Sequence, residues 1–555
     1  MAQLSLNRVT GHYIIVLLLG LGLSIGGTTA SSSPLLFDGL GTFEFKVTTE
    51  NPEARKYVNQ GFVFLYAFNH DEAIRSFQQA ATLDPRCAMA WWGIAHANGP
   101  HINYTMLPPH RAKAAWAALK KAQQNAGNAS PVEKALIEAL GHRFAETPAD
   151  DRSPLDKAYA EAMKKAWQQF PDNADVGALY AESLMDLRPW DLWVDGKPRP
   201  GTPELVETLE QVLKRHPDHI FAMHLYIHAM EASPDPGKAD AAADGLRDTF
   251  PGVGHIVHMP SHIDVRRGRW QAAVLANHKA IAADRAYASR SPEQGFYRIY
   301  MAHNRHMLLF AAMMKGEQTL ALESARGMLA EIPQEWLKND ENASFVDGLF
   351  AMPAEVMMRF GRWDDLLKEP QPADRYPVAR TLSLALRGVA FAAKGQVSEA
   401  RAARQDYQRA VAGIPATASF GNNSAASLFA IGDDLLEGEI LLREGRIDDG
   451  LAVLRKAVSK EDAMRYNEPP DWIHPVRHAL GAALVRAGKH AEAEQVYRED
   501  LQRWPDNGWS LFGLATSLEA QGRHDEAATV RKAFEAVWTN DAVKLTSSCF
   551  CQVTR

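Results

Sequence analysis

The sequence predicts an all-α solenoid, a superhelical array of helix pairs, with loop insertions in its N-terminal half. Three observations predict it: small residues recur at fixed offsets, prolines follow them at a fixed distance, and the same motif returns near both ends of the chain. Small residues let two helices approach closely, and proline ends a helix because it lacks a backbone N–H and clashes with the preceding turn. A chain of 555 residues is too long for a single compact core, which agrees with a repeat array.

The N-terminus, residues 1–30, has the three parts of a secretory signal peptide. Arg8 precedes the apolar run YIIVLLLGLGLSIGG, and the small residues TTASSS follow it, so we expect cleavage after Ala30. An uncleaved anchor is the alternative, although the run is short for a membrane span. We therefore expect a periplasmic or secreted protein with no membrane contact after signal cleavage.

The composition is that of a soluble globular protein, with 46% hydrophobic and 23% charged residues. A net charge of −7 argues against a nucleic-acid partner, which would need a basic surface. Three cysteines cannot build a disulfide framework. Cys549 and Cys551 form either a thiol metal clip or an incidental pair in a frayed tail.

The first repeat covers residues 54–87. With Ala54 as position 1, Gly61 falls at position 8, Phe77 at position 24 and Pro85 at position 32. Clean copies begin at His474 and Gly508, and weaker ones begin near Thr381 and Ile431. This register resembles the tetratricopeptide repeat (TPR) over most of the chain after residue 50. The resemblance implies that positions 2, 5, 9, 12 and 13 of the first helix in each pair line a concave groove.

Two insertions and one hinge define the predicted domains. Segments 98–110 and 188–203 are rich in proline, glycine and tryptophan, cannot continue a helix, and are expected to be functional loops. The proline-rich segment 368–377 is expected to separate two blocks. The expected parts, in chain order, are a signal peptide 1–30, an N-terminal TPR-like domain with the groove 31–367, a linker 368–377, a C-terminal TPR array 378–540 and a tail 541–555.

A histidine pair recurs in the middle of the chain at an interval of one repeat. Placing Pro251 at position 32 makes Ile220 and Gly254 the first residues of successive repeats. Positions 5 and 9, which share one helix face, are then histidines in both repeats. A third helix, registered on Gly316, places histidines at positions 2 and 5. We therefore expect six groove histidines as metal ligands: His224, His228, His258, His262, His303 and His306. His255, assigned to a loop, and His278, on the second helix of a pair, are expected to be structural or to support the ligands from behind.

The kind of ligand indicates the kind of metal. Neutral imidazoles suit copper, zinc, iron or nickel, whereas magnesium and calcium require oxygen ligands. Six histidines exceed the needs of one tetrahedral ion. One arrangement is two ions with about three histidines each, as in coupled dicopper sites, and the other is one ion with three or four. Copper is favoured, with zinc or iron as alternatives. A polar groove lined with histidines that bind no metal is the remaining interpretation.

Three further residues are candidates for catalysis. Glu231 falls at position 12 and could be a ligand or a general base. Tyr300 could donate a hydroxyl proton, and Arg266 could hold an anionic substrate. Glu182 and Asp186, at positions 9 and 13 of the preceding repeat, could add carboxylates to the same groove.

A second resemblance is more local. The segments AMAWWGIA, LMDLRPWDLW, HLYIHAMEAS and GHIVHMPSHI are similar to those of a group of secreted bacterial TPR proteins, over about residues 50–365. This resemblance supports the fold and the site but implies no particular reaction. The motifs are HxxxHxxE and HMPSH.

The predicted function is a secreted metalloenzyme that acts on a small organic substrate in the concave groove. Copper would favour oxidase or oxygenase chemistry, and zinc would favour hydrolysis by an activated water. The alternatives are a non-catalytic scaffold that binds a peptide or protein in the groove, and a periplasmic metal carrier. The C-terminal repeats could bind a protein partner. No phosphate-binding glycine loop, GxSxG elbow or HExxH motif is present in the sequence.

Overall fold

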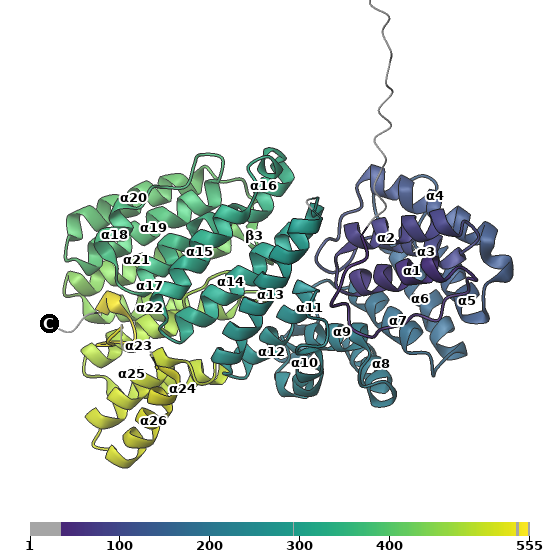
Figure 1. Cartoon of the computed structure of the whole chain (residues 1–555). Coiled ribbons are helices and arrows are strands. Elements are labelled where there is room, and N and C mark those ends of the chain that lie inside the picture. The colour runs from purple at the N-terminus through teal and green to yellow at the C-terminus, as the bar shows by residue number, and fades with distance from the viewer. Residues whose placement is uncertain (1–34, 292, 540–542, 553–555) are drawn as a thin grey trace, which may run out of the picture. The chain divides into compact units, whose positions relative to one another are not determined.

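A computed structural model describes residues 35–291, 293–539 and 543–552, so the predicted signal segment lies outside the described part. Residues from Leu35 onward form one compact unit. The unit is an all-α solenoid of the TPR type, as predicted (Figure 1). Strands within the described residues are confined to two short hairpins, β1 (Trp193–Val194) with β2 (Lys197–Pro198) and β3 (Ser419–Phe420) with β4 (Asn423–Ser424).

The N-terminal part contains the following helices, in chain order: α1 (Pro52–Tyr66), α2 (His70–Leu83), α3 (Ala88–Ala97), α4 (Pro109–Asn125), η1 (Ala126–Asn128), α5 (Pro131–Leu140), α6 (Ser153–Gln169), α7 (Ala174–Asp186), α8 (Thr202–Arg215), α9 (Ile220–Met230), η2 (Pro236–Ala239), α10 (Asp240–Leu246), α11 (Gly254–His258), α12 (Pro260–Arg266), α13 (Trp270–Arg290), η3 (Gly295–Tyr297) and α14 (Arg298–Met314).

The remaining helices, in the same order, are α15 (Gln318–Glu331), η4 (Trp336–Lys338), α16 (Asp340–Val346), η5 (Asp347–Ala351), α17 (Met352–Arg359), α18 (Trp363–Lys368), α19 (Pro377–Ala393), α20 (Val397–Ala412), α21 (Ala425–Arg443), α22 (Ile447–Asp462), α23 (Val476–Arg486), α24 (His490–Arg503), α25 (Gly508–Ala520), α26 (His524–Val537) and η6 (Phe550–Gln552).

Consecutive helices pack as pairs, and the first helix of one pair also contacts the first helix of the next, as in α1 with α3 and α23 with α25. Glycine at position 8 makes the close approach possible. A Cβ added to Gly61 would lie 2.6 Å from the ring of Phe77, and one added to Gly481 would lie 2.5 Å from the ring of Tyr497. Both rings occupy position 24 of their repeats, so the predicted register is confirmed at both ends of the array.

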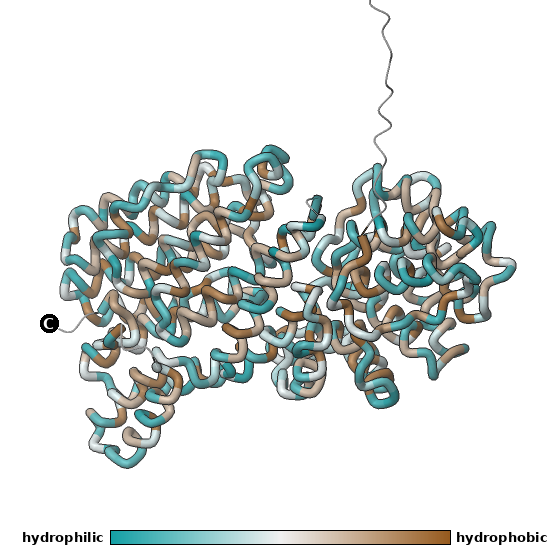
Figure 2. The backbone as a smooth tube through the Cα atoms, viewed as in Figure 1, coloured by the Kyte–Doolittle hydropathy of each residue, from teal (hydrophilic) through white to brown (hydrophobic). Residues whose placement is uncertain are grey.

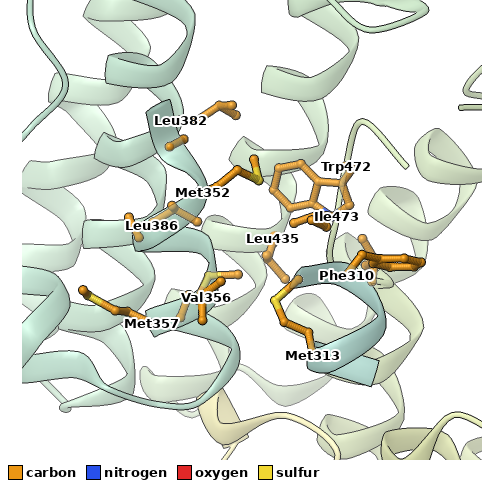
Figure 3. Close-up of a cluster of buried hydrophobic side chains, with 14 of the residues drawn as sticks. Phe310, Met313, Met352, Val356, Met357, Leu382, Leu386, Leu435, Trp472 and Ile473 are labelled. Carbon is orange, nitrogen blue, oxygen red and sulfur yellow. The ribbon is translucent and has the colours of Figure 1, made fainter. Parts of the chain in front are cut away.

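Two clusters of buried apolar side chains form the interior. The first extends from Phe45 to Tyr300 and the second from Val265 to Cys551. Part of the second is drawn in Figure 3, where Phe310, Leu435 and Trp472 come from three separate segments of the chain. Polar and apolar residues alternate along the helices (Figure 2). The two clusters overlap in sequence between Val265 in α12 and Tyr300 in α14.

The predicted linker 368–377 corresponds to the loop between α18 and α19. Leu366 before the loop and Tyr376 at its end both belong to the second cluster. The division of the chain at this loop stays a prediction. No helix in the described part of the chain combines the length and apolarity that a membrane crossing requires.

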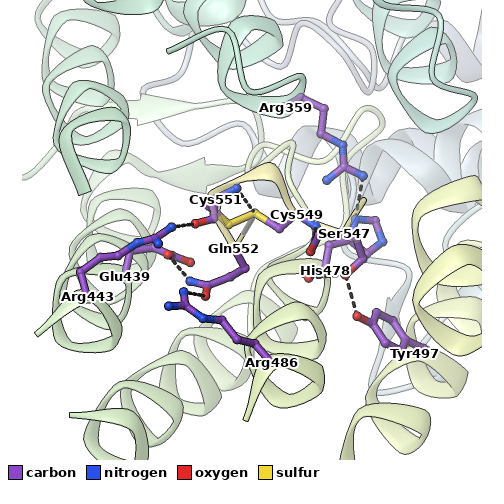
Figure 4. Close-up of a disulfide and its surroundings, with 11 residues drawn as sticks. Arg359, Glu439, Arg443, His478, Arg486, Tyr497, Ser547, Cys549, Cys551 and Gln552 are labelled. Atoms are coloured by element: carbon purple, nitrogen blue, oxygen red, sulfur yellow. Dashed lines mark hydrogen bonds between the residues drawn. A yellow bond between two sulfur atoms is a disulfide. The ribbon is translucent and has the colours of Figure 1, made fainter. Parts of the chain in front are cut away.

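The C-terminal segment 543–552 packs against the array, so the expectation of a frayed tail is wrong for these residues. Cys549 and Cys551 form a disulfide (Figure 4). The Ser548 hydroxyl lies 2.6 Å from the Tyr497 hydroxyl and donates to the backbone oxygen of His478. The Gln552 side chain donates a hydrogen bond to the Glu439 carboxylate, which attaches the segment to α21. The two cysteines therefore lie in an ordered segment and are joined by a disulfide rather than present as free thiols.

We predict that replacing Gly481 by alanine lowers the free energy of unfolding by about 1–3 kcal/mol, because the new methyl group overlaps the Tyr497 ring. Gly127 is the matched control, since a Cβ added there would meet nothing within 4 Å; Gly127→Ala should stay within about 0.5 kcal/mol of wild type. Urea denaturation followed by circular dichroism measures both. Equal midpoints for the two variants would contradict the packing described.

Candidate metal centre

The histidine helices begin where the register predicts. α9 starts at Ile220 and α11 at Gly254, and the two starts are one 34-residue repeat apart. Every residue of α9 is buried, and apolar residues lie on all faces of the helix. Its two histidines therefore lie in the protein interior rather than on a solvent-exposed surface. The α11 helix continues as α12 after Met259, and the third helix is α14.

The first triad consists of His224, His228 and His255. The Nε2 atom of His224 lies 3.1 Å from that of His228 and 3.2 Å from that of His255. All three side chains are buried, and their ligand atoms lie within 4.8 Å of one another. Three imidazoles therefore converge on one point.

The second triad consists of His258, His262 and His303. The Nε2 atom of His262 lies 2.8 Å from that of His258 and 3.5 Å from that of His303. The triads are adjacent, because the ring centroids of His228 and His262 are 5.5 Å apart and those of His255 and His258 are 5.7 Å apart. A single small molecule could therefore contact both triads.

The opposite ring nitrogens show which tautomer is present. Four of the six histidines direct Nδ1 at an oxygen, which can only accept a hydrogen bond, so Nδ1 carries a proton. In the neutral rings Nε2 is then bare, whereas His262, whose pKa the neighbouring carboxylates raise to about 10, holds a second proton on Nε2 until a metal ion replaces it. Histidine ligands of metals are oriented by the same kind of contact. The acceptors are the Tyr66 backbone oxygen for His224 (2.6 Å), the Asn277 side chain for His258 (2.7 Å), Glu231 for His228 (2.9 Å) and Glu468 for His262 (3.2 Å). The Oε2 atom of Glu231 lies 2.6 Å from His262 Nδ1 as an ion-pair contact.

Lone pairs that converge without a hydrogen between them repel one another, and a cation removes that repulsion. Three imidazole nitrogens around a tetrahedral ion with bonds of 2.0–2.1 Å lie about 3.3 Å apart. The contacts of 3.1, 3.2 and 3.5 Å are close to that value, and the 2.8 Å contact between His258 and His262 is shorter. Burial lowers the pKa of His224, His255, His258 and His303 well below the usual range, which keeps these rings neutral. The donor set therefore suits a transition-metal ion in each triad.

Glu231 joins the two triads. It is fully buried at the C-terminal end of α9, and its carboxylate contacts His228 through Oε1 and His262 through Oε2. Burial opposes its charge, yet the two histidines lower the pKa of Glu231 to about 2. Burial likewise opposes charge on His262, but Glu231 and Glu468 raise its pKa to about 10. A positive charge, either a proton or a metal ion, is therefore favoured beside this carboxylate.

Glu468 is a member of the site that sequence reasoning missed. It lies 206 residues after His262, in the loop between α22 and α23, and its Oε2 atom is 3.2 Å from His262 Nδ1. It is buried, and burial raises the pKa of Glu468 to about 8. Glu231, His262 and Glu468 form a third group that could hold an ion through His262 Nδ1. That alternative excludes the hydrogen bond from His262 Nδ1 to Glu468.

A cavity of about 720 Å³ opens beside the triads. His228 and His255 of the first triad and His262 and His303 of the second line it. Both predicted insertions also contribute, residues 102–106 from the first and Pro189 and Trp190 from the second, and so do residues 419–422 and 465–471 of the C-terminal array. The insertions thus shape the pocket beside the histidines, as their composition predicted.

The structure corrects two of the histidine assignments. His255 lies in α11 rather than in a loop and completes the first triad. His306 lines the cavity but belongs to neither triad, and its Nε2 atom has no hydrogen-bond partner among the described residues. Each triad therefore combines positions 5 and 9 of one repeat with position 2 of the next. His255 occupies position 2 of the register that starts at Gly254, so the signal was present in the sequence.

The three predicted catalytic residues have different surroundings. Tyr300 lines the cavity, and its hydroxyl accepts a hydrogen bond from Asn103 at 3.1 Å. Glu231 does not line the cavity and orients two histidines instead of serving as ligand or base in this arrangement. Arg266 donates to the backbone oxygen of Glu231 and lines a separate pocket, so it does not face the histidine cavity.

The carboxylates of the preceding repeat do not join the ligand set. Glu182 Oε2 lies 3.2 Å from His96 Nε2, and Asp186 pairs with Arg143 at 2.5 Å. All four side chains are buried. The expectation that Glu182 and Asp186 extend the histidine site is therefore wrong; Glu182 contacts His96, and Asp186 pairs with the buried Arg143.

No protein-family model and no curated protein matches the chain. Solved structures that are similar to it include the human IFIT1 dimer with m7Gppp-AAAA, at 13% identity and a TM-score of 0.33 over 89% of this chain and 92% of that one. Yeast Tom70 is similar at 11% identity and a TM-score of 0.28, over 87% and 90%. The P58(IPK) TPR domain is similar at 14% identity and 0.21, over 88% and 94%. These low scores carry no argument, and the fold assignment rests on the helix packing described above.

We predict that Glu231→Ala lowers the free energy of unfolding by about 3–5 kcal/mol, because it removes the nearer of the two carboxylates beside the buried His262 and the hydrogen-bond partner of the buried His228. Glu138, which is exposed on α5, is the matched control, and Glu138→Ala should change stability by less than about 0.5 kcal/mol. Chemical denaturation of metal-free protein measures both. A Glu231→Ala protein as stable as the control would show that the carboxylate does not hold the two triads together.

Proposed function

We propose that the protein is a metalloprotein that holds two transition-metal ions, one in each histidine triad. The convergence of the Nε2 atoms carries the proposal: within each triad neighbouring nitrogens are 2.8–3.5 Å apart, and the Nδ1 protons of four rings are committed to oxygen acceptors. Three imidazoles leave a fourth tetrahedral position free, which is typical of catalytic rather than structural sites.

The most favoured metal is copper, with zinc or iron as alternatives. All six donors are imidazole nitrogens, a set that suits these metals rather than magnesium and calcium. Two adjacent three-histidine groups suit a pair of copper ions that act together on one molecule. Bound copper would supply oxygen-dependent oxidation chemistry, which makes an oxidoreductase acting on a small organic substrate the preferred function. Zinc would instead supply an activated water for hydrolysis.

The residues of the chain have separate tasks in this proposal. Glu231 fixes one ring of each triad and balances part of the positive charge that two ions bring. Tyr66 and Asn277 fix two further rings. The cavity receives the substrate against the exposed edges of the triads, and the Tyr300 hydroxyl, whose oxygen already accepts from Asn103, can donate its proton to that substrate. The loops that form the cavity limit the access of water.

We further propose that the protein is exported to the periplasm or outside the cell. The signal-like residues 1–30 support this, and so does the disulfide between Cys549 and Cys551, since disulfides persist in oxidising compartments. Membership of the secreted bacterial TPR group is part of the same proposal.

Two other functions are compatible with the same fold. A non-catalytic scaffold would bind a peptide or protein in the groove or at the C-terminal repeats, which is the common use of TPR arrays. A periplasmic metal carrier would need the histidines but no substrate cavity. The cavity beside both triads favours the enzyme over the carrier, and the buried converging nitrogens favour either of them over the scaffold.

We predict that the purified protein binds about two equivalents of copper or zinc after reconstitution, one per triad. Replacing His224 and His228 by alanine should remove about one equivalent, and replacing His258 and His262 should remove about one as well. His278 and His524 are exposed histidines on α13 and α26, and their double alanine variant is the control that should keep both equivalents. Metal analysis by mass spectrometry, with circular dichroism to monitor folding, measures these outcomes. Less than about a tenth of an equivalent of any transition metal in the wild type would leave only the scaffold.

We predict that copper-loaded protein consumes oxygen in the presence of a panel of small organic reductants, whereas metal-free protein and the His258→Ala/His262→Ala variant consume it at the background rate. An oxygen electrode makes the measurement, with the His278→Ala/His524→Ala protein as control. Two bound coppers without any oxygen uptake across the panel would favour the carrier, and turnover of esters by the zinc form alone would favour the hydrolase.

A further inference from the structure

Aromatic side chains form much of the wall of the cavity beside the triads, together with its polar groups. Six aromatic side chains from separate segments face it, namely Tyr104, Trp190, Phe296, Tyr300, Phe345 and Phe420. They come from the loop after α3, the loop after α7, η3, α14, α16 and β3. A volume of about 720 Å³ lies within the range of pockets that hold small organic ligands. Such a lining favours a flat ligand, because aromatic pairs gain from stacked and edge-to-face contacts.

Most polar groups of the cavity already have partners within the protein. Asn103 uses both ends of its amide, since it donates to the Tyr300 hydroxyl at 3.1 Å and accepts from Trp190 Nε1 at 3.0 Å. Asp471 accepts from the side chains of Asn423 and Asn467. These groups hold the loops in place and are not free to bind a ligand.

His306 is the exception. Outside the triads, it is the one imidazole or carboxyl group of the lining that makes no hydrogen bond to the described residues. It is only 6% exposed, and burial lowers its pKa to about 3, so the ring is neutral and offers one nitrogen as an acceptor. A buried polar group without a partner costs free energy, which a ligand with a matching donor would recover.

The position of His306 also orients such a ligand. His303 of the second triad and His306 lie three residues apart on α14, a rise of about 4.5 Å along the helix. That rise is close to the width of one six-membered ring. The ring centroid of Phe420 lies 6.5 Å from that of His306, so an aromatic wall stands beside the acceptor. A ring anchored at His306 would therefore lie alongside the second triad.

The charge of the lining limits the ligand further. Arg465 is the one arginine or lysine in the cavity wall among the described residues; it is exposed and lies 3.4 Å from the backbone oxygen of Pro189. His262, the other group of the wall at which a positive charge is favoured, already contacts Glu231 and Glu468, so no unpaired cation among the described residues is placed in the wall to pair with an anionic ligand. A neutral molecule is the better match.

We propose that the cavity binds a small neutral aromatic molecule that carries a hydroxyl or amine donor, and that His306 accepts the hydrogen bond from that donor. The proposal names the substrate class of the proposed metalloenzyme and rests on that function only for the conversion of the ligand; binding itself needs no metal. His306 is a positioning and specificity residue in this scheme.

Binding of matched probes tests the proposal. 4-Methylphenol has the ring and the donor, 4-methylanisole has the ring without the donor, and 4-methylcyclohexanol has the donor without the ring. Isothermal titration calorimetry on the full-length protein, both without metal and after reconstitution, should show 4-methylphenol binding at least about tenfold more tightly than either of the others, the loss expected for one hydrogen bond to a buried acceptor. Equal affinity for 4-methylphenol and 4-methylanisole would overturn the proposal, and so would an absence of binding by all three.

Variants locate the acceptor. His306→Leu should weaken 4-methylphenol binding about tenfold and leave 4-methylanisole binding unchanged, and His306→Gln, whose side-chain oxygen can accept, should restore most of the difference. His278→Leu, on the exposed surface of α13, is the matched control. Unchanged selectivity in both His306 variants would contradict the assignment, and the wild-type comparison of probes decides the proposal even if a variant does not fold. Metal content measured in parallel separates the two hypotheses: selective binding without metal would refute the metal centre alone, and two bound ions without selectivity would refute the aromatic ligand alone.

Discussion

The carboxylate of Glu231 is the interaction on which the histidine centre depends. It is one buried negative charge at the end of α9, and it reaches one ring in each triad. Burying such a charge is costly unless cationic or donor groups surround it. The surrounding histidines meet this requirement, and in doing so they are held in a fixed tautomer with their other nitrogens directed at common points. The contacts of Glu231 with His228 and His262 therefore have two effects: they offset the cost of burying the carboxylate, and they orient the rings as metal ligands.

Much of this arrangement is visible in the periodicity of the sequence. A 34-residue interval places the pairs His224, His228 and His258, His262 on equivalent turns, and the helices begin at the residues that the register assigns. The error at His255 has a local cause: glycine and proline around it favour a loop, yet buried packing starts the helix at Gly254. An ideal repeat counted back from Gly316 places His306 at position 5, a groove position. α14 in fact starts at Arg298, and residues three apart on a helix differ in direction by about 60°, so only His303 reaches the triad.

Other parts of the centre could not be read from one sequence. Glu468 reaches His262 across more than two hundred residues, and neither periodicity nor a motif connects them. The same applies to β3 and to the loop 465–471, which lie far along the chain yet line the cavity. Local patterns predict helices and their buried faces, whereas contacts between distant repeats depend on the curvature of the whole array. The C-terminal repeats, expected to be an arm for partners, are therefore also a wall of the cavity.

Each triad takes two histidines from the first helical segment of one repeat (α9, or α11 with α12) and the third from the first helix of the next repeat (α11 or α14). A single repeat cut out of this protein would consequently carry an incomplete donor set. The smallest unit that evolution could duplicate, or an engineer could transplant, with its binding capacity intact is a pair of neighbouring repeats. Adding one histidine-bearing repeat to the array would create one complete metal site at the new junction. Removing one such repeat would remove a complete site, so sites would be gained or lost one at a time.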